Sequence, residues 1–159
     1  MNANTLDQID LNILSLLQQD ARLTSKELAY KLRKGNTTIF ARVTRMKTLG
    51  YITGTVTLID RKKFGDVLIA FTQVNITNHS CEALTDFQKN VVHFPEVMEC
   101  YQMTGEYDFL LKIVVVDMPA YNKFLVQKLA TLQNIGALES HFVLTETKRE
   151  LGYSLETLL

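Results

Sequence analysis

Residues 24–52 read TSKELAYKLRKGNTTIFARVTRMKTLGYI, and this stretch decides the fold of the N-terminal part of the chain. Thr24 and Glu27 form a capping-box pattern, which predicts a helix that begins at Thr24. Gly35 is expected to break this helix, because glycine adopts a left-handed backbone at little cost. A second helix is predicted over residues 36–49. Two short helices around a tight break are typical of a helix-turn-helix, whose second helix enters a DNA groove.

The second predicted helix has two faces of different chemistry. Ile39, Val43 and Met46 are spaced four and three apart, so they share the buried face. At roughly 100° per residue, the side chains that fall nearly opposite are Thr38, Ala41, Arg42 and Arg45. Arginine bonds a guanine edge or holds a phosphate, and a helix N-terminus with short polar side chains suits a phosphate. The residues expected to contact DNA are Arg22, Ser25, Lys26, Asn36, Thr37, Thr38, Ala41, Arg42 and Arg45.

The chain is neutral only because two charged halves cancel. Residues 1–63 hold 11 Lys/Arg and 5 Asp/Glu, a net charge of +6, whereas residues 64–159 hold 6 and 12, a net charge of −6. Between Arg22 and Lys47 there are 8 basic residues and a single acid, Glu27. This asymmetry predicts a polyanionic partner for the first half, the alternative being a solvated surface that happens to be basic.

Outward from this stretch, the N-terminal side predicts a first helix over residues 6–19, from apolar residues at helical spacing. Either Thr5 or Asp7 is expected to cap it. On the C-terminal side, residues 51–59 alternate between apolar and threonine side chains, which predicts a strand. This strand and the following charged residues read as a hinge to a second domain.

The second half changes period and predicts the element order β-α-β-β-α-β of a ferredoxin-like domain. Strands are expected over residues 66–77, 97–103, 107–116 and 138–147. Helices are expected over residues 80–93 and from Asp117 to the loop at 133–136. Because the strands are apolar on both faces and the helices cover one of them, we expect a second copy of the chain to cover the other.

The fold class predicted is therefore α+β, with two domains in 159 residues. We expect a helix-turn-helix domain over residues 1–52, a hinge strand and linker over 53–63, a ferredoxin-like domain over 64–150, and a tail over 151–159. The sequence shows no apolar run of the roughly 18–20 residues that span a bilayer, and no signal peptide, so a cytoplasmic protein without membrane contact is predicted. Cys81 and Cys100 are expected to be reduced thiols, the alternative being a disulfide between them.

Signals for catalysis and metal binding are weak. The sequence contains no GxGxxG, Walker loop, GxSxG or CxxC motif. His79 and Cys81 lie two apart without a second pair at ligand spacing, which argues against a zinc site. No cofactor is expected.

Four segments together resemble the Lrp/AsnC family of transcription regulators. They are LDQIDLNILSLLQQDAR, TSKELAYKLR, RVTRMKTLGYI and TGEYDFLLKIVV, and the resemblance covers about residues 6–147. It implies a winged helix-turn-helix joined by a hinge strand to a βαββαβ regulatory domain. It also implies dimers that assemble further to tetramers or octamers, and gene regulation by a small amino acid-like effector. The chain departs from the family at Lys34-Gly35-Asn36, where an apolar residue followed by Ser-Pro is usual, so the helix loses a hydroxyl N-cap.

The turn Met103-Thr104-Gly105-Glu106-Tyr107-Asp108 has two interpretations. From the residues alone it is a structural hairpin turn. The resemblance implies that it holds the effector at an interface between dimers. Backbone N–H groups would then take a carboxylate, Asp108 would accept from an ammonium group, and Gln133 of a neighbouring subunit would close the site.

Two rival functions remain open at this point. Some Lrp-like proteins resemble this fold and are thought to act as tetrapyrrole (sirohaem) decarboxylases, in which the basic residues would meet substrate carboxylates. A metabolite-binding module that never binds DNA is the other rival, but it has no need of a helix-turn-helix. We expect a regulator rather than an enzyme, with double-stranded DNA, a small effector and further copies of the chain as its partners.

Overall fold

The computed structural model describes residues 5–155, apart from the side chain of Lys62. Two compact units are present, Met1–Leu58 with Lys148–Leu159, and Ile59–Thr147. Residues 1–4 of the predicted N-terminal domain and residues 156–159 of the predicted tail lie outside the described residues. Each unit has a hydrophobic core of its own.

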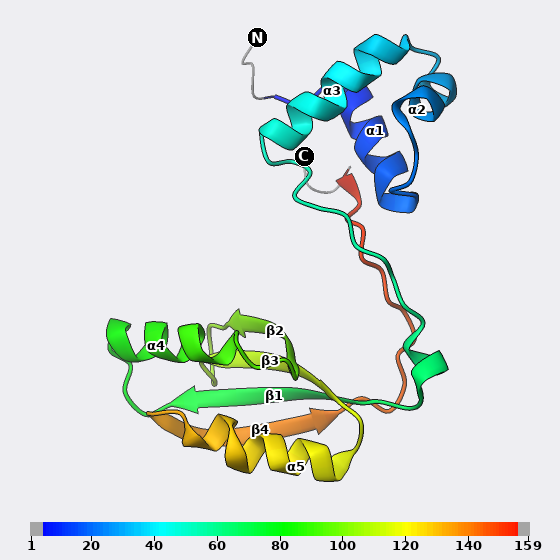
Figure 1. Cartoon of the computed structure of the whole chain (residues 1–159). Coiled ribbons are helices and arrows are strands. Elements are labelled where there is room, and N and C mark those ends of the chain that lie inside the picture. Colours follow the sequence, from blue (N-terminus) through cyan, green and yellow to red (C-terminus); the bar gives the residue numbers. More distant parts are fainter. Residues whose placement is uncertain (1–4, 156–159) are drawn as a thin grey trace. The chain divides into compact units, whose positions relative to one another are not determined.

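The first unit is built from three helices (Figure 1). These are α1 (Gln8–Gln19), α2 (Ser25–Leu32) and α3 (Asn36–Thr48). Ile13, Leu28, Ile39 and Met46 are the large side chains buried between them. Helical spacing of these apolar residues brings one stripe from each helix into a common core, which confirms the predicted three-helix order.

Both predicted capping patterns are present at the helix starts. Asp7, rather than Thr5, caps α1, and the Asp10 side chain accepts from the Asp7 backbone N–H in return. Thr24 caps α2, with Glu27 accepting from the Thr24 N–H at 2.7 Å. Each reciprocal pair satisfies backbone donors that a helix start leaves without partners.

The expected left-handed break at Gly35 is wrong, because the left-handed residue is Arg33. Arg33 has φ 52° and ψ 48°, and the N–H of Lys34 closes the end of α2 by donating to the carbonyl of Ala29 at 3.0 Å. Gly35 has φ −68° and serves as the N-cap of α3, without a side-chain cap hydrogen bond. A left-handed conformation costs a non-glycine residue roughly 1–2 kcal/mol, which the surrounding packing has to offset.

The strand predicted over residues 51–59 is not formed. No strand is assigned among the described residues of the first unit, and residues 53–60 are exposed. Alternation of apolar and polar side chains predicts which residues of a strand would share a face. It does not supply the second strand that the backbone N–H and C=O groups need.

The second unit is a four-stranded antiparallel sheet with the order β2-β3-β1-β4 (Figure 1). Its elements in chain order are η1 (Arg61–Phe64), β1 (Leu68–Ile76), α4 (Cys81–Val91), β2 (Val97–Gln102), β3 (Phe109–Val115), α5 (Met118–Gln127), η2 (Leu129–Thr131) and β4 (Ile135–Phe142). This is the predicted β-α-β-β-α-β order. The last strand begins and ends earlier than expected.

One face of the sheet packs on α4 and α5. In β3, residues 109, 111, 113 and 115 are buried and the residues between them are half-buried. The helix-covered core includes one polar group, Thr72, whose hydroxyl lies 2.7 Å from that of Tyr121. Tyr121 in turn lies 2.5 Å from the Ser140 hydroxyl, so this buried polar group is hydrogen-bonded.

The strand register gathers three turns at one end of the sheet. Val74 of β1 is opposite both Phe109 and Leu138, and Ile76 is opposite Ile135. The turn after β1, the β2–β3 turn and the loop before β4 therefore lie at the same end. The first residues of β1 and the last of β4 lie at the other end, because Ala70 pairs with Phe142.

Candidate functional sites

Four charged side chains form a cluster where α3 packs on α1. Asp10 is fully buried. Its Oδ1 accepts from Arg42 Nη1 at 2.9 Å and its Oδ2 accepts from Arg45 Nη2 at 2.5 Å. Arg42 Nη1 also donates to Asp7 Oδ2 at 2.7 Å. A buried carboxylate is tolerated only when it is paired and hydrogen-bonded, and both oxygens of Asp10 meet that condition.

Two members of the cluster, Arg42 and Asp7, have shifted pKa values. Hydrogen bonds to Asp10, and then to Asp7, raise the pKa of the Arg42 guanidinium. The pKa of Asp7 is lowered, chiefly because the carboxylate accepts from the backbone N–H of Asp10 and then because of Arg42. Both shifts favour the charged forms of the Arg42–Asp7 pair.

The expectation that Arg42 and Arg45 point outward from the core is wrong. Only 25% and 36% of their side-chain surface is exposed, and both reach sideways to α1. A helical wheel shows which side of α3 lies opposite the apolar stripe, but not which neighbouring helix covers the flank. A signal was present in the sequence: Asp7 and Asp10 are three apart, as are Arg42 and Arg45, so two acids on one helix match two bases on another.

The exposed face of α3 includes Thr38 and Ala41, as expected, but not Arg42 and Arg45. Its exposed residues are Asn36, Thr37, Thr38, Phe40, Ala41, Thr44, Lys47 and Thr48. Four of these, Asn36, Thr37, Thr38 and Ala41, belong to the predicted DNA-contacting set. Phe40, Thr44 and Lys47 are exposed as well, although they lie outside that set.

The N-terminus of α3 offers backbone donors without a side-chain cap. Gly35 as N-cap has no side chain to accept from the first N–H groups of the helix. Asn36, Thr37 and Thr38 follow it and are exposed. Such a helix start is a suitable site for an anion, because free N–H groups and the positive end of the helix dipole coincide.

The predicted basic residues before and within α2 are at the surface. Lys26 is exposed and Ser25 is half-buried at the first turn of α2. Arg22 is 90% exposed and pairs with Asp20 through two hydrogen bonds, at 2.9 Å and 3.0 Å. The Arg22 side chain, followed by the Arg22 backbone N–H, lowers the pKa of Asp20 to about 2. A phosphate at Arg22 would have to compete with this carboxylate.

At the end of the sheet that carries the β2–β3 turn, Asp108 closes the turn predicted to hold the effector. Its Oδ2 accepts from the Ile76 backbone N–H at 2.7 Å, and its Oδ1 lies 3.0 Å from His79 Nε2. The backbone of Asp108 also bonds Val74 and Met103. Asp108 therefore ties β1 to β3, a structural role that the sequence did not indicate. Gly105 in the same turn has φ 121°, a conformation that favours glycine.

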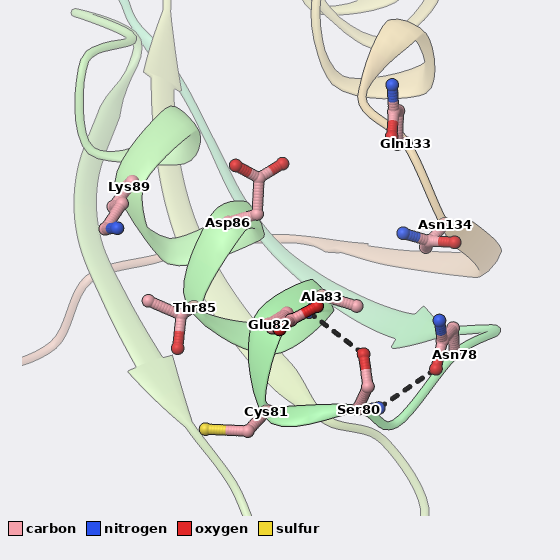
Figure 2. Close-up of a pocket in the computed structure, with 10 residues that line it drawn as sticks. All are labelled: Asn78, Ser80, Cys81, Glu82, Ala83, Thr85, Asp86, Lys89, Gln133 and Asn134. Atoms are coloured by element: carbon pink, nitrogen blue, oxygen red, sulfur yellow. Dashed lines mark hydrogen bonds between the residues drawn. The ribbon is translucent and has the colours of Figure 1, made fainter.

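The rest of the turn is open to solvent. Met103, Thr104, Gly105 and Glu106 are exposed, and Tyr107 is half-buried. Gln133 lies at the same end of the sheet but lines a separate open depression of about 530 Å³ beside α4 (Figure 2). Asn78, Ser80, Asp86, Lys89 and Asn134 also line this depression. No residue of the turn at 103–108 is among the residues that line this depression.

Two sequence families match the two units. Residues 6–53 match the winged helix-turn-helix DNA-binding model, and residues 69–153 match the Lrp/AsnC ligand binding domain. The chain belongs to the Lrp/AsnC family.

Relatives across the Lrp/AsnC family support this assignment over nearly the whole chain. The Bkd operon transcriptional regulator of Pseudomonas aeruginosa is 34% identical over 87% of this chain and 91% of its own length. The DNA-binding transcriptional activator DecR of Escherichia coli is 32% identical over 95% of this chain and 99% of its own length. Among solved structures, the regulator NMB0573 of Neisseria meningitidis, crystallised with L-Met, has a TM-score of 0.90 at 32% identity, covering 98% of this chain and 100% of its own.

The protein is thus a DNA-binding transcriptional regulator of the Lrp/AsnC type, with a domain for an amino acid or related small effector. No helix among the described residues is long and apolar enough to cross a membrane. Within the same residues, no group of three or more His, Cys, Asp or Glu is placed to hold a metal ion.

Proposed function

We propose that the exposed face of α3 enters the major groove of double-stranded DNA while the surrounding basic residues bind phosphates. The observation that carries this is the Asp10–Arg42–Arg45 cluster, which fixes α3 on α1 with its uncapped N-terminus and its threonine-rich face turned to solvent. Phosphate contacts at the start of a recognition helix set its register, and base edges are read along its exposed side.

In this proposal the predicted DNA-contacting residues divide into two roles. Direct contact with DNA is assigned to Arg22, Ser25, Lys26, Asn36, Thr37, Thr38 and Ala41. Arg42 and Arg45 act through Asp10 as positioning residues, because their guanidinium groups are already engaged by buried or partly buried carboxylates. Their exposed fraction adds positive potential along the same edge of the helix.

The proposal includes a homodimer that assembles further to a tetramer or octamer. The face of the sheet away from α4 and α5 carries Ile69, Phe71, Leu110 and Val114 near its centre, which follows from the pairing of Ile69 with Val114 and of Gln73 with Leu110. The linker also exposes Val56, Leu58 and Ile59. Antiparallel sheets whose second face is also apolar need a cover for that face, and a second copy of the chain would supply it. Two recognition helices in one dimer would read two half-sites.

The effector is proposed to bind where the turn of one subunit meets another subunit. Met103, Thr104, Gly105, Glu106, Tyr107 and Asp108 form that turn, and Gln133 lies at the same end of the sheet. Two separate surfaces at one end suit a site that is completed between subunits. The Neisseria relative, crystallised with L-Met, supports an amino acid as the class of effector.

The proposal assigns the protein a regulatory role without catalysis and without a cofactor. The relatives named above are regulators, and no observation on this chain favours the tetrapyrrole decarboxylase alternative. Because a regulator works on the chromosome, a cytoplasmic location is part of the same proposal.

The test is the affinity of the full chain for labelled duplex DNA drawn from a randomised library, measured by fluorescence anisotropy over a range of salt concentrations. The logarithm of the affinity should fall linearly with the logarithm of the salt concentration, with a slope of about −0.9 for each phosphate that the protein neutralises. Replacing the exposed Lys26 by alanine should weaken binding to all sequences and reduce that slope by about one. Absence of binding to any duplex at low salt would overturn the proposal.

A further inference from the structure

The face that α3 turns to solvent carries methyl groups and an aromatic ring instead of guanidinium groups. At roughly 100° per residue, Thr37, Phe40 and Thr44 share one side of the helix, with Ala41 next to them. Phe40 is 61% exposed, although it is a large apolar side chain. None of the exposed residues of α3, all of which the structure describes, is an arginine.

This face is outward because the arginines of α3 are held elsewhere. Arg42 and Arg45 both bond Asp10, and Ile39 and Met46 are fully buried. The helix therefore cannot rotate to present its arginines without breaking a buried ion pair. Breaking such a pair is strongly destabilising, because one charge stays buried without a partner.

An exposed phenylalanine within a basic surface indicates a partner that is a polyanion and also offers an apolar group. Apart from Arg42 and Arg45, six basic side chains from Arg22 to Lys47 are exposed, so the surface selects a polyanion. The apolar group that double-stranded DNA offers in its major groove is the C5-methyl of thymine, and alanine, threonine methyl and phenylalanine contacts are the ones that read it. Guanine, by contrast, is read mainly by arginine or lysine.

We propose that Phe40 is a specificity-determining residue that packs against thymine C5-methyl groups, with Thr37, Ala41 and Thr44 lining the same methyl-reading surface. This inference rests on the proposed placement of α3 in the major groove. The inference implies that the DNA sequence bound by the protein has thymine at the positions that Phe40 contacts. Burying one methyl group against the ring corresponds to about a four-fold gain in affinity.

Deoxyuridine tests the inference, because it differs from thymidine only by lacking this methyl group. A duplex selected by the full-length protein from a randomised library is resynthesised with single thymines replaced by uracil. At the contacted positions the wild-type protein should lose about four-fold in affinity. Phe40→Ala should bind the thymine duplex more weakly and should no longer distinguish thymine from uracil there.

Tyr30→Ala is the matched control, because Tyr30 is an aromatic residue on α2 with 87% of its surface exposed. This variant should keep the full thymine–uracil difference. Circular dichroism checks that both variants are folded, which is expected since neither side chain is buried.

Three results would overturn the inference in different ways. If the wild-type protein binds the selected duplex but tolerates uracil at every position, no methyl group is read. If Phe40→Ala keeps the wild-type difference, another residue reads the methyl. If the wild-type protein retains no duplex from the library even at low salt, the proposed DNA-binding function itself fails, and the inference fails with it.

Discussion

Asp10 is fully buried beneath α3, and its Oδ1 accepts a hydrogen bond of 2.9 Å from Nη1 of Arg42. Together with Arg45, this pair joins the first and third helices of the DNA-binding unit. Side chains that resemble DNA contacts in the sequence therefore hold the recognition helix in place. The distinction matters for mutagenesis, because loss of DNA binding in an arginine variant would report on the placement of α3 as well as on contact.

We expect Asp10→Ala to destabilise the first unit by about 3–5 kcal/mol, because two guanidinium groups lose their buried acceptor. Urea denaturation followed by circular dichroism measures this change. Asp7→Ala is the control: about half of the Asp7 side chain is exposed, so the loss of its cap should cost about 1 kcal/mol. Equal effects of the two substitutions would contradict the central role of Asp10.

The Arg22–Asp20 pair makes a prediction about pH. The pKa of Asp20 is lowered from 3.8 to about 2, first by the Arg22 side chain and then by the Arg22 backbone N–H. A carboxylate whose pKa is lower in the folded than in the unfolded chain stabilises the folded state at pH values above its pKa in the unfolded chain. This contribution is lost as the pH falls from about 4 to about 2. An NMR titration of the Asp20 carboxyl carbon should give a midpoint near 2 in the wild-type protein.

In Arg22→Ala the same titration should return only part of the way to 3.8, because the backbone N–H of residue 22 still donates to Asp20 Oδ1. A midpoint near 3.8 already in the wild-type protein would show that the ion pair does not form in solution.

The N-terminus of α3 is expected to show opposite effects on stability and on DNA binding. Gly35 has an ordinary φ of −68°, and a Cβ there would meet only Thr38 Oγ1, at 3.6 Å, so a side chain fits. Gly35→Asp should stabilise the unit by a few tenths to about 1 kcal/mol, by capping the helix and favouring its dipole. The same carboxylate should weaken DNA binding, because it occupies the proposed phosphate position.

Gly35→Ser is the matched control, since it adds a cap without a charge. It should raise the melting temperature slightly and lower the affinity for duplex DNA much less than the aspartate does. If both variants bind DNA as tightly as the wild-type protein, the start of α3 is not a phosphate site.

Local sequence patterns predicted most helices and strands of this fold, but they did not predict the contacts between these elements. Thr24 and Glu27 cap α2 as expected, because a capping box involves residues only three apart. The outward placement of Arg42 and the strand over residues 51–59 are wrong, since each depends on a partner from a distant part of the chain: Asp10 in one case and an unsupplied second strand in the other. The turn at 103–108 was found through family resemblance, but the tie from Asp108 to Ile76 required the sheet register.

Asp108 is predicted to contribute to both stability and effector binding, so the choice of substitution matters. Asp108→Ala leaves the Ile76 N–H without its acceptor and should cost about 1–3 kcal/mol, instead of leaving the fold intact as the turn alone would suggest. Asp108→Asn keeps an oxygen for that N–H but removes the charge. Its thermal unfolding should therefore stay close to that of the wild-type protein.

The effector response separates these roles. In a thermal-shift screen against the twenty amino acids, a cognate amino acid should raise the melting temperature of the wild-type protein by mass action. Asp108→Asn should lose this shift, because the ammonium group of the amino acid loses its acidic partner. His79→Ala, which removes an exposed neighbour of Asp108 but leaves the carboxylate, should keep it. A full shift in Asp108→Asn would exclude Asp108 as the ammonium acceptor and would leave it a structural tie between β1 and β3.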